Sequence, residues 1–270
     1  MQDLSDKHPP FPMKKLLCSL FLSALPFTGW AQVVQSGDWF DDIAKDADRY
    51  YTRDRLTRLG IAVGLGAVVA NTNADQSIQN SIQGGRSSGT DSFSTSVKQI
   101  GEWKYMLPIS WAVSALLPTD VGGLQTWGNL TLRAIVVGTP STLLVQRAAG
   151  GSRPNEEGVA VPDSKWRPFQ DDNSVSGHSF VGAIPFLAMA ELNNYSIGLK
   201  TLGYAASLAV PFSRMNDNDH YPSQAALGWF MAYESVQTVM ESGKRKDTAL
   251  RIVPIQMAQG QLGLRLQKSW

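Results

Sequence analysis

The chain has 270 residues, of which 43% are hydrophobic and 17% are charged. That length and composition support one large hydrophobic core or two small ones, and they exclude disordered and fibrous proteins. The 24 basic and 23 acidic residues give a formal net charge of +1. Because binding to polynucleotide phosphates needs a broad basic surface, no nucleic-acid partner is expected.

Residues 1–31 have the pattern of a secretory signal peptide. Two lysines follow Met13, an apolar stretch covers residues 16–27, and a small-x-small cleavage signal ends at Ala31. Met13 is an alternative start of translation, because the proline-rich residues before it fit neither a signal nor a fold. A membrane anchor is the other interpretation of this segment, although its apolar stretch is short for a span.

Cleavage after Ala31 would remove Cys18 and one histidine, leaving His178 and His220 as the two histidines of the mature chain. A chain without cysteine forms no disulfide and no thiolate metal site, and two histidines do not suffice for a histidine-rich zinc site. We therefore expect no metal. We also expect export to the periplasm, with at most a peripheral contact to the membrane.

The first part of the mature chain predicts helices. Residues 38–58 are rich in charge and carry apolar residues at helical spacing, which indicates an amphipathic helix. Residues 59–70 are almost wholly apolar. Residues 71–95 are rich in Asn, Ser and Gly, so they are expected to begin as a polar helix end and to continue as a loop.

Further apolar segments have the length of helices and lack the alternation of strands. They are residues 105–117, 130–145, 180–192, 201–212 and 225–240. Connections rich in Gly, Pro and Asp separate them. The pattern predicts an all-α helical bundle over residues 32–243.

Charged residues interrupt or end three of these segments, at Arg133, Glu191 and Glu234. None of the segments cleanly reaches the roughly 20 apolar residues that a membrane span needs. A bundle outside the membrane is therefore expected, and a membrane-embedded bundle is the alternative.

Residues 244–270 differ in character from the bundle. A polar linker comes first, and two stretches that alternate polar with apolar residues then flank Gly260. This alternation predicts a small C-terminal β-hairpin.

Three short segments carry groups that bind phosphate esters. Residues 146–154 form a Gly-rich turn with two arginines, residues 174–178 open a helix with Ser-Gly-His, and residues 213–224 hold a Ser-Arg pair and a histidine. Arginine binds phosphate with two hydrogen bonds, and amides at a helix start add further donors. Each segment alone has an ordinary structural explanation. Both histidines of the mature chain, however, fall within these segments.

At these residues the chain resembles the superfamily of type 2 phosphatidic acid phosphatases and vanadium haloperoxidases. The family pattern is a Lys, then six intervening residues and Arg-Pro, then Pro-Ser-Gly-His, then Ser-Arg with five residues to a His and three more to an Asp. The order and spacing are the same here, over residues 100–240. The positions of this chain that correspond to the pattern's functional residues are Gln146, Arg153, Ser176, Gly177, His178, Arg214, His220 and Gln224.

The resemblance implies that His220 is the nucleophile, which forms a phosphohistidine, and that His178 is the acid that protonates the leaving oxygen. Gln224 completes this catalytic set. The resemblance also implies a phosphate-binding set, and its members are Gln146, Arg153, Ser176, Gly177 and Arg214. Fixed guanidinium groups would offset the charge on the phosphoryl oxygens, and no metal takes part.

Two departures from the family pattern affect the chemistry. Gln146 replaces a phosphate-binding lysine, and Arg147 or Lys165 could supply the missing charge. Gln224 replaces the aspartate that orients the nucleophile. A glutamine accepts a hydrogen bond from the ring but brings no charge.

A carboxylate near the nucleophile could compensate for the lost aspartate. Asp217 and Asp219 both lie within three residues of His220. Such an Asp-Asn-Asp run more often caps or solvates a loop, so both interpretations stay open.

The leading hypothesis is an exported, metal-independent phosphatase that hydrolyses a phosphomonoester or a pyrophosphate, with a phosphorylated small molecule or a lipid phosphate as its substrate. The second hypothesis is a phosphate-binding or scaffold protein with weakened catalysis, because two charged positions of the pattern are glutamines. The third is a vanadium haloperoxidase, which the missing lysine disfavours. Only in that case would a cofactor, vanadate, be expected. The sequence leaves the oligomeric state open.

Overall fold

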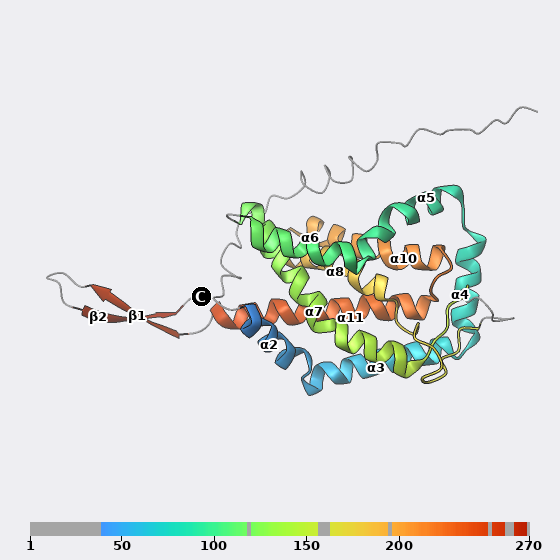
Figure 1. The fold of residues 1–270 in the computed structure, drawn as a ribbon, viewed down its shortest axis with the longest axis horizontal. Coiled ribbons are helices and arrows are strands. Elements are labelled where there is room, and N and C mark those ends of the chain that lie inside the picture. The colour runs from blue at the N-terminus through green and yellow to red at the C-terminus, as the bar shows by residue number, and fades with distance from the viewer. Residues whose placement is uncertain are drawn as a thin grey trace, which may run out of the picture.

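The computed structural model of the protein describes residues 39–117, 120–155, 163–193, 196–247, 250–256 and 262–268. The signal peptide predicted for residues 1–31 lies outside these ranges. The described chain is a bundle of α-helices followed by a two-stranded hairpin (Figure 1), so the predicted all-α class is confirmed.

The helices follow one another with short connections. The first half contains α2 (Trp39–Tyr50), α3 (Arg53–Ala70), α4 (Asn73–Gly84), α5 (Ser88–Val97), α6 (Trp103–Leu116) and α7 (Leu124–Ala149). The second half contains α8 (Gly177–Leu192), α9 (Ile197–Ser207), α10 (Ala209–Asn216) and α11 (Pro222–Asp247). Two short 3-10 helices, η1 (Lys98–Gly101) and η2 (Val121–Gly123), precede α6 and α7.

Helices α7, α8 and α11 pack against one another and form the centre of the hydrophobic core. Gly138 of α7 marks a close approach between them. A Cβ atom at this position would collide with Ser235 Oγ of α11 and would lie 2.8 Å from a ring carbon of Phe180 of α8. Only a residue without a side chain permits this contact.

The amphipathic helix predicted for residues 38–58 is two helices, which corrects the prediction. The break lies at Thr52, whose backbone is extended (ψ 153°) at the N-cap of α3. The Thr52 hydroxyl donates to the carbonyl of Arg49 at 3.1 Å, so it satisfies a backbone group at the end of α2. The apolar residues 59–70 continue α3.

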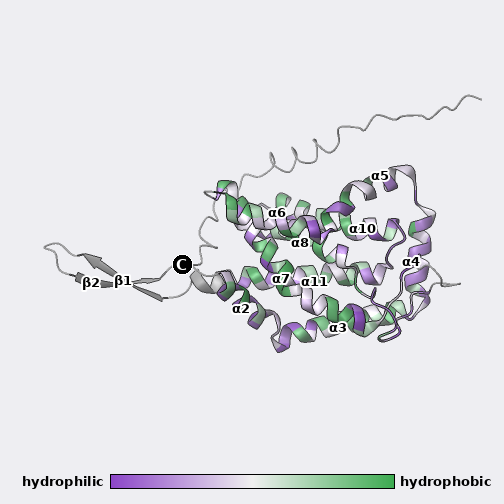
Figure 2. Cartoon of the chain, viewed as in Figure 1, coloured by the Kyte–Doolittle hydropathy of each residue, from purple (hydrophilic) through white to green (hydrophobic). Residues whose placement is uncertain are grey.

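Residues 71–95 contain most of two helices, where a helix end followed by a loop was expected. Thr72 caps the start of α4, and a capping box at Ser87 starts α5. Helix α4 is mostly hydrophilic (Figure 2), and polar contacts hold it against its neighbours, such as the 2.9 Å hydrogen bond from Gln79 Nε2 to the carbonyl of Met215. A helix held by hydrogen bonds carries no apolar stripe, and its sequence therefore resembles a loop.

The later apolar segments correspond to helices α6 to α11. The segment at residues 201–212 is divided, because α9 ends before Leu208 and α10 begins after it. The other four segments each overlap one helix.

Charged residues within the apolar segments are paired across the bundle. Arg133 of α7 forms hydrogen bonds of 2.7 and 2.8 Å with Asp46 of α2. Arg55 of α3 lies 2.6 Å from Glu234 of α11. Because removal of one partner would leave a buried charge unpaired, these pairs fix α2 and α3 against the core.

The helices of the bundle, α2 to α11, differ in length and in hydropathy. Within the described part of the chain, none of them is both long enough and apolar enough to cross a membrane.

The C-terminal hairpin is present. Strand β1 (Leu250–Gln256) pairs in antiparallel register with β2 (Leu262–Lys268), which places Val253 opposite Arg265. Helix α11 continues to Asp247, so the predicted linker from residue 244 begins as helix.

Candidate active site

The three predicted segments meet where α7 ends and where α8 and α11 begin. Gln146 lies in the last turn of α7, Ser176 caps α8, and Gln224 lies in the first turn of α11. Hydrogen bonds connect them: the Ser176 amide donates to the Gln224 carbonyl at 3.0 Å, and Gln146 Nε2 donates to the carbonyl of Val175 at 2.7 Å. The phosphate-binding and catalytic residues that the resemblance implies therefore share one region.

The loop after α7 turns at Gly150 and carries Arg153 into this region. Gly150 has a φ of 66°, and a Cβ atom there would collide with the carbonyl of Arg167. The part of the loop just before α8 pairs with this turn, because the backbone amide of Asn173 donates to the carbonyl of Gly151 at 2.8 Å. Asn173 is thereby fixed beside Arg153, whose Nε donates to Asn173 Oδ1 at 2.7 Å.

His220 lies between α10 and α11, and Gln224 holds its ring. The ring Nδ1 is 2.9 Å from Gln224 Oε1. Two backbone groups fix the orientation of the Gln224 amide: Oε1 accepts from the Tyr221 amide at 3.1 Å, and Nε2 donates to the carbonyl of Ser152 at 2.7 Å. Since Oε1 can only accept, Nδ1 of His220 carries the proton and Nε2 keeps its lone pair.

The surroundings of His220 favour its neutral form. The residue is 2% exposed. Burial lowers the pKa of His220 to about 3, the charges of Arg153 and Arg214 act in the same direction, and the hydrogen bond to Gln224 acts in the opposite direction. A neutral imidazole with a free lone pair is the form that attacks phosphorus.

His178 is the second residue of α8, and its partner is Glu102. The ring Nε2 lies 3.2 Å from Glu102 Oε1. Burial lowers the pKa of His178, and the charge of Arg214 lowers it further, whereas Glu102 raises it. The contact with His178 in turn lowers the pKa of Glu102.

Arg214 has an unpaired donor in this region. Its Nη2 lies 2.7 Å from Asp219 Oδ2, but its Nε is buried and has no hydrogen-bond partner among the described residues. Burial lowers the pKa of Arg214, and Asp219 opposes that effect. A buried guanidinium N–H without a partner is a donor that an anion could satisfy.

The start of α8 supplies backbone donors to the same region. The Ser176 hydroxyl accepts from the Ser179 amide at 3.2 Å and so caps the helix. The amides of the first turn lack partners within a helix, and the helix dipole is positive at that end. Gly177 lies beside the end of α7, where a Cβ atom would make an ordinary van der Waals contact, of 3.4 Å, with Gln146 Nε2.

The structure answers two questions that the sequence left open. Arg147 and Lys165 are both exposed, and the cations that act on His220 are Arg153 and Arg214. Gln146 itself brings a neutral amide to the position where the resemblance implies a lysine.

Asp217 and Asp219 do not hold the ring of His220. Lys98 Nζ lies 3.3 Å from Asp217 Oδ2, and Asp219 pairs with Arg214. The interpretation of either aspartate as the ring's partner is therefore wrong. That place is taken by Gln224.

A cavity of about 220 Å³ lies beside His178 between α6, α7 and α8. Gln146, Gly177 and His178 line one part of it. Its apolar lining residues include Trp103, Leu107, Ile135, Leu143, Phe180 and Val181. The cavity therefore places apolar side chains next to His178, the predicted acid.

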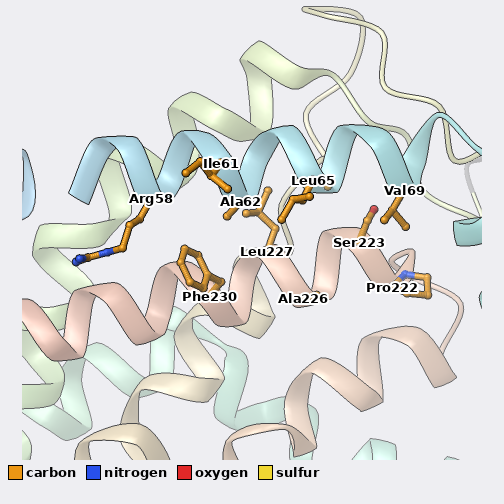
Figure 3. A pocket seen from close by; sticks show the side chains of 11 residues that line it. Arg58, Ile61, Ala62, Leu65, Val69, Pro222, Ser223, Ala226, Leu227 and Phe230 are labelled. Atoms are coloured by element: carbon orange, nitrogen blue, oxygen red, sulfur yellow. The ribbon is translucent and has the colours of Figure 1, made fainter. Parts of the chain in front are cut away.

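A larger cavity, of about 530 Å³, lies elsewhere in the bundle. Figure 3 shows it between α3, with Ile61 and Leu65, and α11, with Leu227 and Phe230. Neither histidine lines it, so its size alone does not make it the reaction site.

Two residues of this region lie outside the three motifs. Asn173 directly precedes the second motif, and that proximity was the available signal. Glu102 is 76 residues from His178 and belongs to no motif, so only the fold connects them.

Comparisons with known proteins give limited similarity. No family model matches the chain, and no curated protein matches its sequence. The first transmembrane PAP2-type phosphatidylglycerolphosphate phosphatase structure from Bacillus subtilis aligns with 70% of this chain and 96% of its own, at 15% identity and a TM-score of 0.49.

Proposed function

We propose that the protein is a phosphatase that forms a phosphohistidine at His220 and needs no metal ion. The observation that carries this proposal is the hydrogen bond between His220 and Gln224, which leaves Nε2 unprotonated beside two guanidinium groups. Arg153 and Arg214 would hold the phosphoryl oxygens, with Ser176 and the first amides of α8.

The reaction would proceed in two displacements. In the first, Nε2 of His220 bonds to phosphorus, the bond from phosphorus to the leaving oxygen breaks, and His178 gives that oxygen its proton. In the second, a water attacks the phosphorus, His178 takes a proton from the water, and the phosphorus–nitrogen bond breaks. The products are an alcohol, inorganic phosphate and the starting form of His220.

The cavity beside His178 favours a substrate with an apolar alcohol, such as a lipid phosphate. Because His178 protonates the leaving oxygen, the leaving group would lie on the side of His178. On that side Trp103, Leu107 and Phe180 line a cavity of about 220 Å³. Burial of alkyl carbons there would stabilise binding by about 0.8 kcal/mol per methylene. Pyrophosphate would gain nothing from this lining.

A phosphate-binding or scaffold protein with weakened catalysis is the second candidate. The neutral Gln146 and Gln224 favour it, because a family lysine and aspartate are both missing. A vanadium haloperoxidase is the third candidate, in which vanadate would occupy the phosphate position. We further propose that the chain acts in the periplasm, on the basis of the signal-like residues 1–31.

A phosphate-release assay tests these candidates together. The purified protein is incubated with EDTA and with pyrophosphate or alkyl phosphates of increasing chain length, and the His220→Asn variant serves as the control. We expect turnover that increases with chain length and is absent in the variant. Tight binding of inorganic phosphate without turnover would favour the binding protein. Bromide oxidation after addition of vanadate and peroxide would favour the haloperoxidase.

A further inference from the structure

Glu102 occupies a defined place opposite the predicted acid. It lies at the junction of η1 and α6, where its backbone is extended (φ −80°, ψ 110°) and serves as the N-cap of α6. Its Oε1 is 3.2 Å from Nε2 of His178, and Lys104 Nζ lies 3.5 Å from its Oε2. The side chains of Glu102 and His178 are 26% and 32% exposed, so the pair is partly shielded from water.

Close packing holds this junction against α8. A Cβ atom on Gly101 would lie 2.8 Å from the carbonyl oxygen of His178 and 3.0 Å from its Cβ. Any side chain at position 101 would push the η1–α6 junction away. The absence of a side chain at Gly101 therefore brings the carboxylate of Glu102 within reach of the ring.

We propose that Glu102 is a positioning residue for His178: its carboxylate fixes the ring and favours the protonated imidazole that donates to the leaving oxygen. The part of this inference that concerns donation rests on the proposed function. The contact itself does not, and it can be measured in the absence of any turnover.

The charges around His178 explain why such a partner is needed. Arg214 of α10 and Arg153 of the loop after α7 are both cations that disfavour a charged ring. His220 and Asp219, between α10 and α11, and Lys104, on α6, lie around the same groups. Glu102 is the negative charge in direct contact with the ring, and it offsets two guanidinium groups that the phosphate requires.

The direct test is the pKa of His178, measured by NMR on protein with ¹⁵N-labelled histidine. The chain has three histidines, so assignment needs few variants. We expect the Glu102→Gln variant to lower the pKa of His178 by about one pH unit, because an amide of the same length carries no charge. The Glu191→Gln variant, at the opposite end of α8, should leave it unchanged. An unchanged pKa of His178 in a folded Glu102→Gln variant would overturn the inference.

Turnover provides the second readout and separates the inference from the proposed function. With an alkyl phosphate, Glu102→Gln should lower kcat about tenfold near neutral pH and move the basic limb of the pH–rate profile downward. With an aryl phosphate whose phenolate leaves without protonation, the change should be small. Glu102→Asp keeps the charge but shortens the reach, and it should recover part of kcat. If Glu102→Gln lowers kcat equally on both substrates while the pKa of His178 falls as expected, the acid role of His178 is contradicted. The contact between Glu102 and His178 would still be supported.

Discussion

Nδ1 of His220 and Oε1 of Gln224 are 2.9 Å apart, and this hydrogen bond lies where the family resemblance implies a histidine–aspartate pair. The same Gln224 side chain donates to the carbonyl of Ser152, and its own carbonyl accepts from the amide of Ser176. One residue therefore sets the tautomer of His220, the proposed nucleophile, and connects the three segments of the candidate site.

The charge of this partner can be changed at constant length. In a Gln224→Glu variant the carboxylate would favour protonated His220 and raise its pKa from about 3. Because protonation removes the lone pair, the acidic limb of the pH–rate profile should move to higher pH. The carboxylate would also face the carbonyl of Ser152, so the variant should be less stable. Paired pH–rate and thermal unfolding measurements test both effects.

The Gln224→Met variant is the control for the hydrogen bond itself. It removes both the acceptor for His220 and the donor to Ser152, so kcat should fall well below that of the Gln224→Glu variant. Equal kcat in a folded Gln224→Met variant would mean that the amide does not set the tautomer.

Asp219 should affect substrate binding rather than the pKa of His220. Its contact with Arg214, at 2.7 Å, holds one guanidinium of the site, and such charged hydrogen bonds contribute about 1.5–3 kcal/mol. The Asp219→Ala variant should therefore raise KM at least about tenfold without moving the acidic limb. The Asp217→Ala variant, which loses a contact to Lys98, is the matched control and should have a smaller effect. A shifted acidic limb in Asp219→Ala would argue against Gln224 as the partner of His220.

The Gln146→Lys variant introduces a lysine at the position where the family resemblance implies one. Gln146 already donates to the carbonyl of Val175 at 2.7 Å, and a lysine could keep a donor there while adding a charge near the phosphate. We expect inorganic phosphate to inhibit about tenfold more strongly. Gln125→Lys lies on the same helix and replaces a similar hydrogen bond, from Gln125 to the carbonyl of Ser114 at 3.1 Å. Equal effects of the two lysines would place Gln146 outside the phosphate site.

The glycine at the centre of the core gives a prediction about stability. Gly138→Ala would force Ser235 and Phe180 apart, which should lower the free energy of unfolding by about 1–3 kcal/mol. Gly64→Ala, on α3, is the control, because nothing lies within 4 Å of a Cβ there and alanine favours a helix. Denaturant titrations of both variants measure the difference. A Gly138→Ala protein as stable as the unmodified protein would show that the core rearranges to accommodate a methyl group.

The family resemblance implied one contact of the site. It implied a hydrogen bond from the ring of His220 to Gln224, and the structure has this contact, between Gln224 in the first turn of α11 and His220 just before that helix. The helix-length apolar segments likewise located α6 to α11, because burial in the core leaves a clear mark on the sequence.

Other parts of the fold and the site left no such mark. The pair of His178 and Glu102 depends on how η1 packs on α8, and no spacing within the chain indicates it. The sequence also did not indicate which cation pairs with each aspartate, because Asp217 and Asp219 lie in the same short polar run. Helix α4 was missed because polar contacts, rather than an apolar face, hold it.

Trapping the phosphorylated enzyme tests the central claim most directly. The protein would be mixed with a ³²P-labelled alkyl phosphate, quenched in alkaline denaturant, in which phosphohistidine survives, and digested for peptide mapping. The account predicts label on the peptide that contains His220 and no label in the His220→Asn variant. Turnover without label on His220, or an undiminished rate in the folded variant, would contradict it.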